Sequence, residues 1–434
     1  MKKALIICYY WPPAGGGGVQ RWLKFVKYLP EFGWHPIVYV PENADYPLLD
    51  YSLVTDVSPR ATVIKHPIAE PYDYYRRLIG MKTKDKLDPG FLSQGKRLNW
   101  KQKIGVWIRG NFFIPDARCL WINPSVRFLS QYVKKNPVDC IISTGPPHSC
   151  HVIAKKLKEK TGIPWLADLR DPWTQIDYFN DLKLNFISRY LHQRLERKTL
   201  NAADHLSVIG PTMAKMLAAV TTTPIEILTN GYDEADLQNI NVRLDSKFSV
   251  TYIGTINDAQ NPLTLWKALS ALNQENHELM NHLVVRIVGK AEQSVWESIK
   301  YYKLDSWIEY VGYVDHLKSI MYQRQSQILL LLINNTWNNK LIVTGKIFEY
   351  ITSGRPIICI GPPDGDAAMI LESTRSGKTF DYSEHEFLKD HLIDLYNMNK
   401  GSELFTHNSE HHESFNRKNI TRKLSGILGR ITQK

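Results

Sequence analysis

A short segment in the second half of the chain combines residue types that bind phosphate and ribose. Thr344, Gly345 and Lys346 stand at the start of a helix expected over residues 343–351, and Glu349 follows one turn later. Free N–H groups and the positive dipole end make a helix N-terminus a good seat for phosphate. A carboxylate can accept two hydrogen bonds from the neighbouring hydroxyls of a ribose. The spacing therefore predicts a nucleoside diphosphate site.

A run of four glycines near the N-terminus offers a second place for a phosphate. It follows a strand expected over residues 4–8 and leads into a helix expected over residues 19–29. Without side chains, Gly16 and Gly17 let the backbone approach a phosphate closely. A flexible turn is the alternative, and the spacing does not give the Gly-x-Gly-x-x-Gly pattern of a dinucleotide site.

Two aspartates and a histidine follow buried strands in the first half. Asp168 and Asp171 come at the end of the strand expected over residues 165–168, where open α/β sheets bind ligands, and His148 follows the preceding strand. One of the two carboxylates could orient an acceptor hydroxyl, and His148 could reach the same cleft. The alternatives are an ion pair between Arg170 and an aspartate, and a capping role for His148.

Strands alternate with helices along most of the chain, which predicts βαβ units and parallel sheets. The expected strands are residues 4–8, 37–39, 62–64, 139–143, 165–168, 205–208, 226–228, 249–253, 283–288, 307–310, 328–333 and 356–360. The expected helices are residues 19–29, 149–159, 186–201, 211–219, 262–272, 294–301, 316–324, 343–351 and 366–373. Residues 70–123 are expected to be irregular and to carry acceptor or membrane contacts.

Positive charge is concentrated in the first half of the chain. The formal net charge is +11, and residues 1–205 hold 31 Lys and Arg against 18 Asp and Glu. Ten basic residues lie between Arg76 and Arg109, interleaved with Trp100 and Trp107 and followed by Phe112. Basic and aromatic residues together favour peripheral contact with an anionic membrane surface. A solvated insertion is the alternative, and nucleic acid is disfavoured because no binding motif accompanies the charge.

Composition indicates the compartment and argues against a metal site. The five cysteines are odd in number and lack Cys-x-x-Cys spacing, which fits a reducing cytosol better than a disulfide framework. No stretch approaches the ~18 apolar residues of a spanning helix. We therefore expect a cytoplasmic protein, with any membrane contact at the inner face. Asp364 and Asp366 resemble an Asp-x-Asp metal motif, but their place before a helix favours capping, so no metal or other cofactor is expected.

The chain resembles glycosyltransferase family 4. Glu349, Gly354 and Pro356 fall at the spacing of the second half of that family's Glu-x7-Glu element, and the glycine run resembles its phosphate loop. Asn230 and Gly231 resemble the turn before its second domain. This resemblance implies the α/β GT-B fold, in which two Rossmann-like domains with doubly wound parallel sheets face each other across a cleft. It also implies a nucleotide-sugar-dependent, retaining enzyme.

A role is expected for each candidate residue. Donor contacts are expected from Gly16, Gly17, Arg21, Gly254, Lys290, Thr344, Gly345, Lys346 and Glu349. Gly16 and Gly17 would contact the donor diphosphate from the first domain. Catalytic roles are expected for Lys346, Asp168, Asp171 and His148.

Three departures from the family pattern concern the donor. The first glutamate of the Glu-x7-Glu element is Leu341, and the arginine after the domain-opening glycine is Thr255. The expected lysine falls on Gln260 or Asn261. Lys346 is then the substitute cation, with Arg21 and Lys290 behind it.

The sequence supports one function best and leaves two alternatives. We expect an enzyme that moves a sugar from a UDP- or GDP-sugar to a polysaccharide or lipid-linked glycan acceptor, in cell-surface polysaccharide biosynthesis. The alternatives are a catalytically weakened scaffold in an assembly complex and a sugar-nucleotide epimerase. A chain of 434 residues suggests two domains of about 200 residues each. We place them at residues 1–240 and 241–412, with a final helix at about 413–434 packing back on the first.

Overall fold

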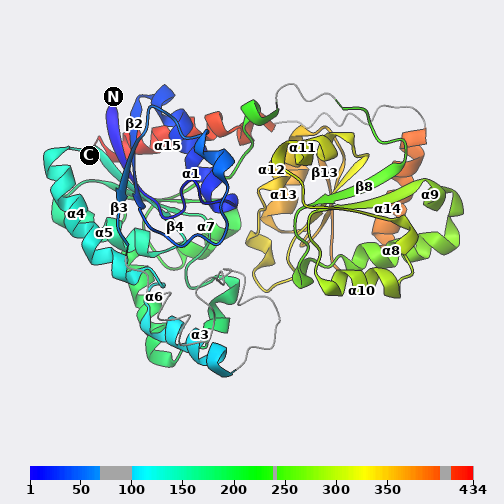
Figure 1. Ribbon diagram of the computed structural model, residues 1–434, viewed down its shortest axis with the longest axis horizontal. Coiled ribbons are helices and arrows are strands. Elements are labelled where there is room, and N and C mark those ends of the chain that lie inside the picture. The colour runs from blue at the N-terminus through cyan, green and yellow to red at the C-terminus, as the bar shows by residue number, and fades with distance from the viewer. Residues whose placement is uncertain (69–99, 238–241, 401–411, 434) are drawn as a thin grey trace. The chain divides into compact units, whose positions relative to one another are not determined.

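The computed structural model describes residues 1–68, 100–237, 242–400 and 412–433, and divides them into two compact units (Figure 1). Unit 1 comprises Met1–Asn230 and Arg417–Lys434, and unit 2 comprises Gly231–Asn416. The chain leaves unit 1 before the expected residue 240 because Tyr232 is already buried in the core of unit 2. Its backbone N–H donates to the carbonyl of Phe415, where the chain returns.

Unit 1 is built on a sheet of seven parallel strands in the order β3-β2-β1-β4-β5-β6-β7. The strands are β1 (Lys2–Ile7), β2 (Trp34–Pro41), β3 (Thr62–His66), β4 (Cys140–Gly145), β5 (Trp165–Leu169), β6 (His205–Val208) and β7 (Ile225–Ile227). The central strands are buried on both faces, as their continuous apolar runs require.

Helices cover both faces of this sheet. The helices of unit 1 in the described residues are α1 (Gly17–Tyr28), α3 (Trp100–Phe112), α4 (Ile122–Lys135), α5 (Ser149–Thr161), α6 (Phe186–Leu200), α7 (Pro211–Ala218) and α15 (Arg417–Ile431). Apolar residues of α1 and α15 share one core with one face of the sheet. Residues of α4, α5 and α7 form the core on the other face. The C-terminal helix α15 therefore belongs to unit 1, beside α1 (Figure 1).

Unit 2 repeats this plan with six parallel strands in the order β10-β9-β8-β11-β12-β13. The strands are β8 (Phe248–Ile253), β9 (Leu283–Val288), β10 (Ile308–Gly312), β11 (Ile328–Leu332), β12 (Ile357–Ile360) and β13 (Gly377–Phe380). The helices are α8 (Leu263–Glu275), α9 (His277–His282), α10 (Gln293–Tyr301), α11 (His316–Gln325), α12 (Lys346–Thr352), α13 (Asp366–Ser373) and α14 (His385–Lys400). One core includes residues of α8, α9, α10 and α14, and the other includes residues of α12 and α13.

The twelve expected strands are all present, but one strand and several helices were not expected. Strand β13 and helices α9 and α14 are additions in unit 2. Helices α3 and α4 fall in or overlap residues 70–123, so the expectation of an irregular region is wrong for them. Residues 70–99 lie outside the described residues. Of the helices in the described part of the chain, none combines the length and the apolar character needed to span a membrane.

Candidate functional site

Two glycines of unit 2 bring neighbouring strand ends into direct contact. Gly254 follows β8 and Gly289 follows β9, with φ of 130° and 127°, values that side chains rarely allow. The Gly254 N–H donates to the Val288 carbonyl at 2.7 Å. A Cβ on Gly289 would lie only 2.1 Å from the Gly254 oxygen. Both positions therefore need glycine, at the carboxyl ends of the strands, where open α/β sheets bind ligands.

The side chain of Lys346 reaches this strand end from α12. Its Nζ donates to the Tyr252 hydroxyl at 2.8 Å and lies 4.5 Å from the centre of that ring. A Cβ on Gly254 would lie 2.3 Å from the same Nζ. Two residues expected in the donor site, Gly254 and Lys346, are thus in contact.

The Lys346 ammonium has charge to offer a ligand. Burial lowers the pKa of Lys346 from 10.5 to about 8, while the nearby Glu349 carboxylate acts in the opposite direction. The side chain is therefore mostly charged at pH 7. Within the described residues Lys346 has no ion-pair partner at 4 Å or less. A partly desolvated cation without a counterion favours an anionic ligand.

The helix that carries Lys346 is shorter than expected. It begins at Lys346 rather than at residue 343 and has seven residues, with Gly345 as N-cap. We therefore assign any attraction for phosphate to the Lys346 ammonium rather than to a helix terminus. Gly345 is exposed, and the Thr344 hydroxyl is buried without a hydrogen-bond partner among the described residues.

Glu349 is held in place from a neighbouring helix. Its Oε2 accepts a hydrogen bond of 2.9 Å from Nε2 of Gln323 on α11, whose side chain is 2% exposed. The other carboxylate oxygen of Glu349 has no partner in the described regions and can accept from a ligand. Sequence reasoning missed Gln323. A polar residue three positions after the buried Ile320 on an expected helix was the available signal.

Thr255, Gln260 and Asn261 stand in the loop after β8 where the family has cations, and all three side chains are uncharged. Asn261 uses its amide on Ser294, Ser298 and Trp266, at distances of 2.9–3.2 Å. Leu341 is buried at 9% exposure. Lys290 is exposed and directly follows Gly289, so it lies at the same sheet edge as Gly254.

Arg21 and Asp168 were expected in the site, but the structure places both in the interior of unit 1. Asp168 lies within β5, not after it, and both side chains are at most 1% exposed. Arg21 Nη2 bonds the Asp168 carboxylate at 2.7 Å, and Trp22 and Ser207 donate to the same group. Burial alone would raise the pKa of Asp168, but Arg21 holds it below its usual value. The pair positions α1 on the sheet and leaves no free group for a ligand.

Asp171 and the glycine run remain at the accessible edge of the sheet. Asp171 is paired with Arg170 at 3.2 Å, as the alternative interpretation expected, yet its side chain is 38% exposed. A Cβ on Gly18 would lie 2.3 Å from Arg170 Nη1, so the guanidinium rests on the start of α1. Space remains open around Gly16 and Gly17.

His148 lies beside this edge at the N-cap position of α5, but its side chain makes no capping hydrogen bond. Its ring stacks on Trp173, with ring centres 4.7 Å apart, and neither ring nitrogen has a partner among the described residues. The N-terminus of α5 is capped by Asp116 instead, through the backbone and hydroxyl of Ser149 at 2.8 Å. Burial lowers the pKa of His148 to about 3, so the imidazole is neutral at pH 7. It can offer a neutral hydrogen bond.

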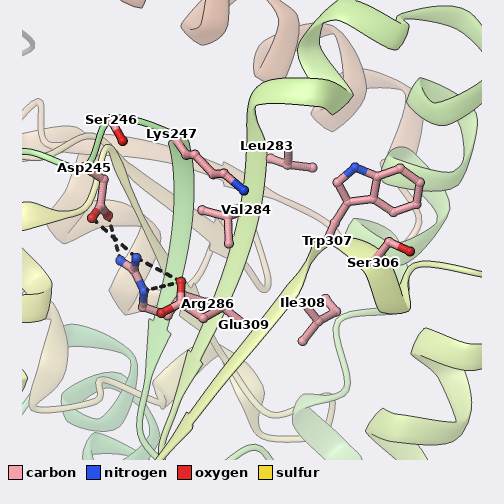
Figure 2. Close-up of a pocket in the computed structure, with 10 residues that line it drawn as sticks. All are labelled: Asp245, Ser246, Lys247, Leu283, Val284, Arg286, Ser306, Trp307, Ile308 and Glu309. Carbon is pink, nitrogen blue, oxygen red and sulfur yellow. Dashed lines mark hydrogen bonds and ion pairs between the residues drawn. The ribbon is translucent and has the colours of Figure 1, made fainter.

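A separate pocket of about 420 Å³ opens in unit 2 (Figure 2). It is lined by Asp245, Ser246, Lys247, Leu283, Val284, Arg286, Ser306, Trp307, Ile308 and Glu309. Arg286 lies between Asp245 and Glu309, at 2.6 and 3.0 Å, so its charge is already compensated. The pocket is at the amino ends of β8, β9 and β10, opposite to Gly254. It is therefore not the expected donor site.

Comparison with known proteins agrees with the fold and with the family resemblance. The model of Glycosyltransferase Family 4 matches residues 15–236. No curated protein matches the chain in a sequence search.

Several solved structures share the fold at low sequence identity. A glycosyltransferase from Rickettsia africae ESF-5 superposes with a TM-score of 0.63 at 12% identity, covering 99% of this chain and 98% of its own. HepE from Anabaena, in complex with UDP-glucose, superposes with a TM-score of 0.60 at 12% sequence identity, covering 99% of this chain and 100% of HepE. An alpha,alpha-trehalose-phosphate synthase (UDP-forming) from Burkholderia xenovorans, in complex with glucose-6-phosphate, superposes with a TM-score of 0.60 at 12% sequence identity, covering 100% of both chains. These matches establish the GT-B fold.

Proposed function

This chain belongs to glycosyltransferase family 4, and from that premise we propose that it transfers a sugar from a nucleoside diphosphate sugar to a polysaccharide or lipid-linked glycan. One observation carries the proposal. The Lys346 ammonium lies against Gly254 at the strand ends of unit 2, and Glu349 follows one helical turn later. A cation and a carboxylate at this spacing suit a diphosphate and a ribose.

The donor is held by groups of unit 2. Lys346 neutralises the diphosphate, with Lys290 as a second cation at the same edge. The unpartnered oxygen of Glu349 accepts from a ribose hydroxyl, while Gln323 fixes the orientation of the carboxylate. Gly345 contributes an exposed backbone to the donor site, and Thr344 contributes a buried hydroxyl. We propose a UDP- or GDP-sugar, in keeping with the UDP-glucose bound by HepE.

Transfer breaks the bond between the sugar C1 and the diphosphate oxygen and forms a bond from C1 to the acceptor oxygen. The electron pair of the broken bond leaves with the diphosphate oxygen, which takes up the proton that the acceptor hydroxyl loses. Negative charge grows on the departing oxygen, where Lys346 is already held by Tyr252. Preorganised charge of this kind is usually the largest contribution to catalysis. Retention of configuration is part of the proposal because the family resemblance implies it.

The acceptor binds to unit 1 in this proposal. The carboxylate of Asp171, 38% exposed, can bond an acceptor hydroxyl, and the neutral imidazole of His148 lies at the same sheet edge with both ring nitrogens buried. Gly16 and Gly17 are also proposed as donor contacts, on the basis of the family resemblance alone. We propose a cytoplasmic enzyme without a metal or other cofactor, acting where a lipid-linked acceptor is presented at the membrane.

The test is calorimetric titration of UDP, GDP, CMP and dTDP, and then of the matching sugar nucleotides, into the purified protein without added metal. We expect selective binding that is lost in Glu349→Ala and kept in the control Glu372→Ala, because Glu372 is exposed on α13. Binding of none of them would favour the scaffold alternative. Conversion of a sugar nucleotide to an epimer without acceptor would identify the epimerase alternative.

A further inference from the structure

Two helices of unit 1 expose large apolar side chains, none of which is a predicted site residue. They are α3 and the first two turns of α6, and we call their exposed side the α3–α6 face. Its apolar members are Trp100, Ile104, Trp107, Phe112, Phe186, Ile187, Tyr190 and Leu191, all exposed. Phe186 is 82% and Phe112 69% exposed, which is unusual for side chains of this size. An exposed patch of this kind marks an interaction site.

The two helices are fixed to each other, so the face is a built surface. Asn111 of α3 is 7% exposed, and its side chain bonds the backbone of Lys183 and of Asn185 at 3.3 and 2.9 Å. The Ser188 hydroxyl of α6 donates to the Asn111 carbonyl at 3.2 Å. A Cβ on Gly110 would lie 2.8 Å from the Leu182 oxygen, so α3 approaches the start of α6 as closely as backbone allows.

The exposed charge of the two helices has one sign. The 13 residues of α3 include three basic residues and no acidic one. Helix α6 carries four basic residues, of which Arg194, Arg197 and Lys198 are exposed. Its one acid, Glu196, is buried at 1% exposure and accepts from Thr174. The exposed charges on the two helices are therefore positive, and the exposed carboxylate of Asp181 lies in the segment that joins them, directly before Leu182, which contacts α3.

We propose that the α3–α6 face docks the protein on an anionic lipid bilayer. Large apolar side chains enter the interface between headgroups and acyl chains, while surrounding cations meet the anionic headgroups. Figure 1 shows α3 and α6 at the end of unit 1 away from α1 and α15. The sequence suggested membrane contact only for the basic stretch that ends in α3. The structure adds α6 to this surface.

The charge argues against a second copy of this chain as the occupant. A symmetric dimer through this face would oppose the cations of α3 and α6 to one another, with no exposed carboxylate on either helix to compensate them. A bilayer containing phosphatidylglycerol supplies the opposite charge and an apolar phase together. The docking does not depend on the transfer reaction, so it is tested without a donor.

The experiment is flotation of the full-length protein with vesicles of phosphatidylglycerol and phosphatidylcholine, compared with vesicles of phosphatidylcholine alone. We expect binding to the anionic vesicles only, weakened by raising salt from about 0.05 to about 0.5 M because salt screens surface charge. The double variant Phe186→Ser with Tyr190→Ser removes two apolar contacts, and Arg194→Glu with Arg197→Glu reverses two charges. Each should reduce binding roughly tenfold or more.

Matched controls come from unit 2. Tyr313→Ser with Leu317→Ser changes two equally exposed apolar residues, and Lys267→Glu with Lys300→Glu reverses two exposed cations. Both controls should bind like the unaltered protein. No binding to anionic vesicles, or equal losses in the control variants, would overturn the proposal. A concentration-dependent dimer that the Phe186 and Tyr190 variant abolishes, with no vesicle binding, would assign the face to a second copy instead.

Discussion

The ammonium of Lys346 is held by the hydroxyl and the ring face of Tyr252, at 2.8 Å and 4.5 Å. Tyr252 is 1% exposed and belongs to β8, so the contact fixes a cation of α12 at the end of a core strand. The partners of Lys346 are uncharged, and burial disfavours its charge. A diphosphate at this place would supply the missing countercharge without rearranging the cation, which is what a preorganised site requires.

Replacing Lys346 with methionine should therefore slow transfer more than it weakens donor binding. We expect Lys346→Met to lower kcat by about 100-fold, because charge on the leaving diphosphate grows in the transition state. Steady-state kinetics with a sugar nucleotide and its acceptor would measure kcat and both KM values. Lys300→Met, an exposed lysine on α10, is the control. A change confined to the KM of the acceptor would contradict this role.

The affinity for a nucleoside diphosphate should fall as the pH rises through about 8. The pKa of Lys346 is lowered to about 8 in the free protein, so its ammonium is present below this pH and lost above it. A bound diphosphate favours the charged form and raises the pKa, so binding takes up a proton in the alkaline range. Calorimetry from pH 6.5 to about 9.5 tests this expectation. In Lys346→Arg the fall should disappear, since arginine stays charged.

A side chain at Gly254 should displace the cation of Lys346. In Gly254→Ala the new Cβ would meet Nζ at 2.3 Å, and the positive φ adds backbone strain of about 1–3 kcal/mol. We expect weaker nucleoside diphosphate binding and lower stability of unit 2. Gly312→Ala is the control, because φ is also positive there but a Cβ meets nothing within 4 Å. Equal nucleotide affinity in Gly254→Ala and the unaltered protein would remove Lys346 from the donor site.

Glu349 should discriminate ribose from deoxyribose. Glu349→Ala should weaken UDP or GDP binding by about 1.5–3 kcal/mol, the scale of a hydrogen bond to a charged group. The same variant should bind the 2′-deoxy nucleotide about as well as the ribonucleotide. Gln323→Leu only frees the carboxylate, so its loss should be smaller, about 1 kcal/mol. Unchanged affinity in Glu349→Ala would contradict the ribose contact.

The sequence predicted the sheets well because their signal is local. Continuous apolar runs such as Ile328–Leu332 form strands buried on both faces, and each one expected was found. Helix α4 was missed although Ile122, Val126, Leu129 and Val133 recur at helical spacing, because the preceding basic stretch suggested an irregular region. The unexpected strand β13 carries a single fully buried residue, Phe380, and lies at the edge of its sheet.

The partners of the candidate site residues could not be predicted from the sequence, because side-chain partners are not local. The contact between Gly254 and Lys346 joins residues 92 positions apart, yet each was selected by its own motif. Arg21 and Asp168 were assigned to ligand binding from their types, but 147 positions separate two groups that neutralise each other. Types and spacing show which residues can bind charge. They do not show which residues have already found a partner inside the protein.

Asp168 and Asp171 should therefore respond differently to the same substitution. Asp168→Asn leaves Arg21 as a buried charge without its counterion, and we expect the free energy of unfolding to fall by about 3–5 kcal/mol. Asp171→Asn disturbs only a half-exposed pair with Arg170, so stability should change by less than about 1 kcal/mol. Urea denaturation followed by tryptophan fluorescence, together with transfer kinetics, separates the two. Loss of turnover at unchanged stability in Asp171→Asn would support an acceptor contact, whereas full activity and stability in Asp168→Asn would show that the buried network does not position the site.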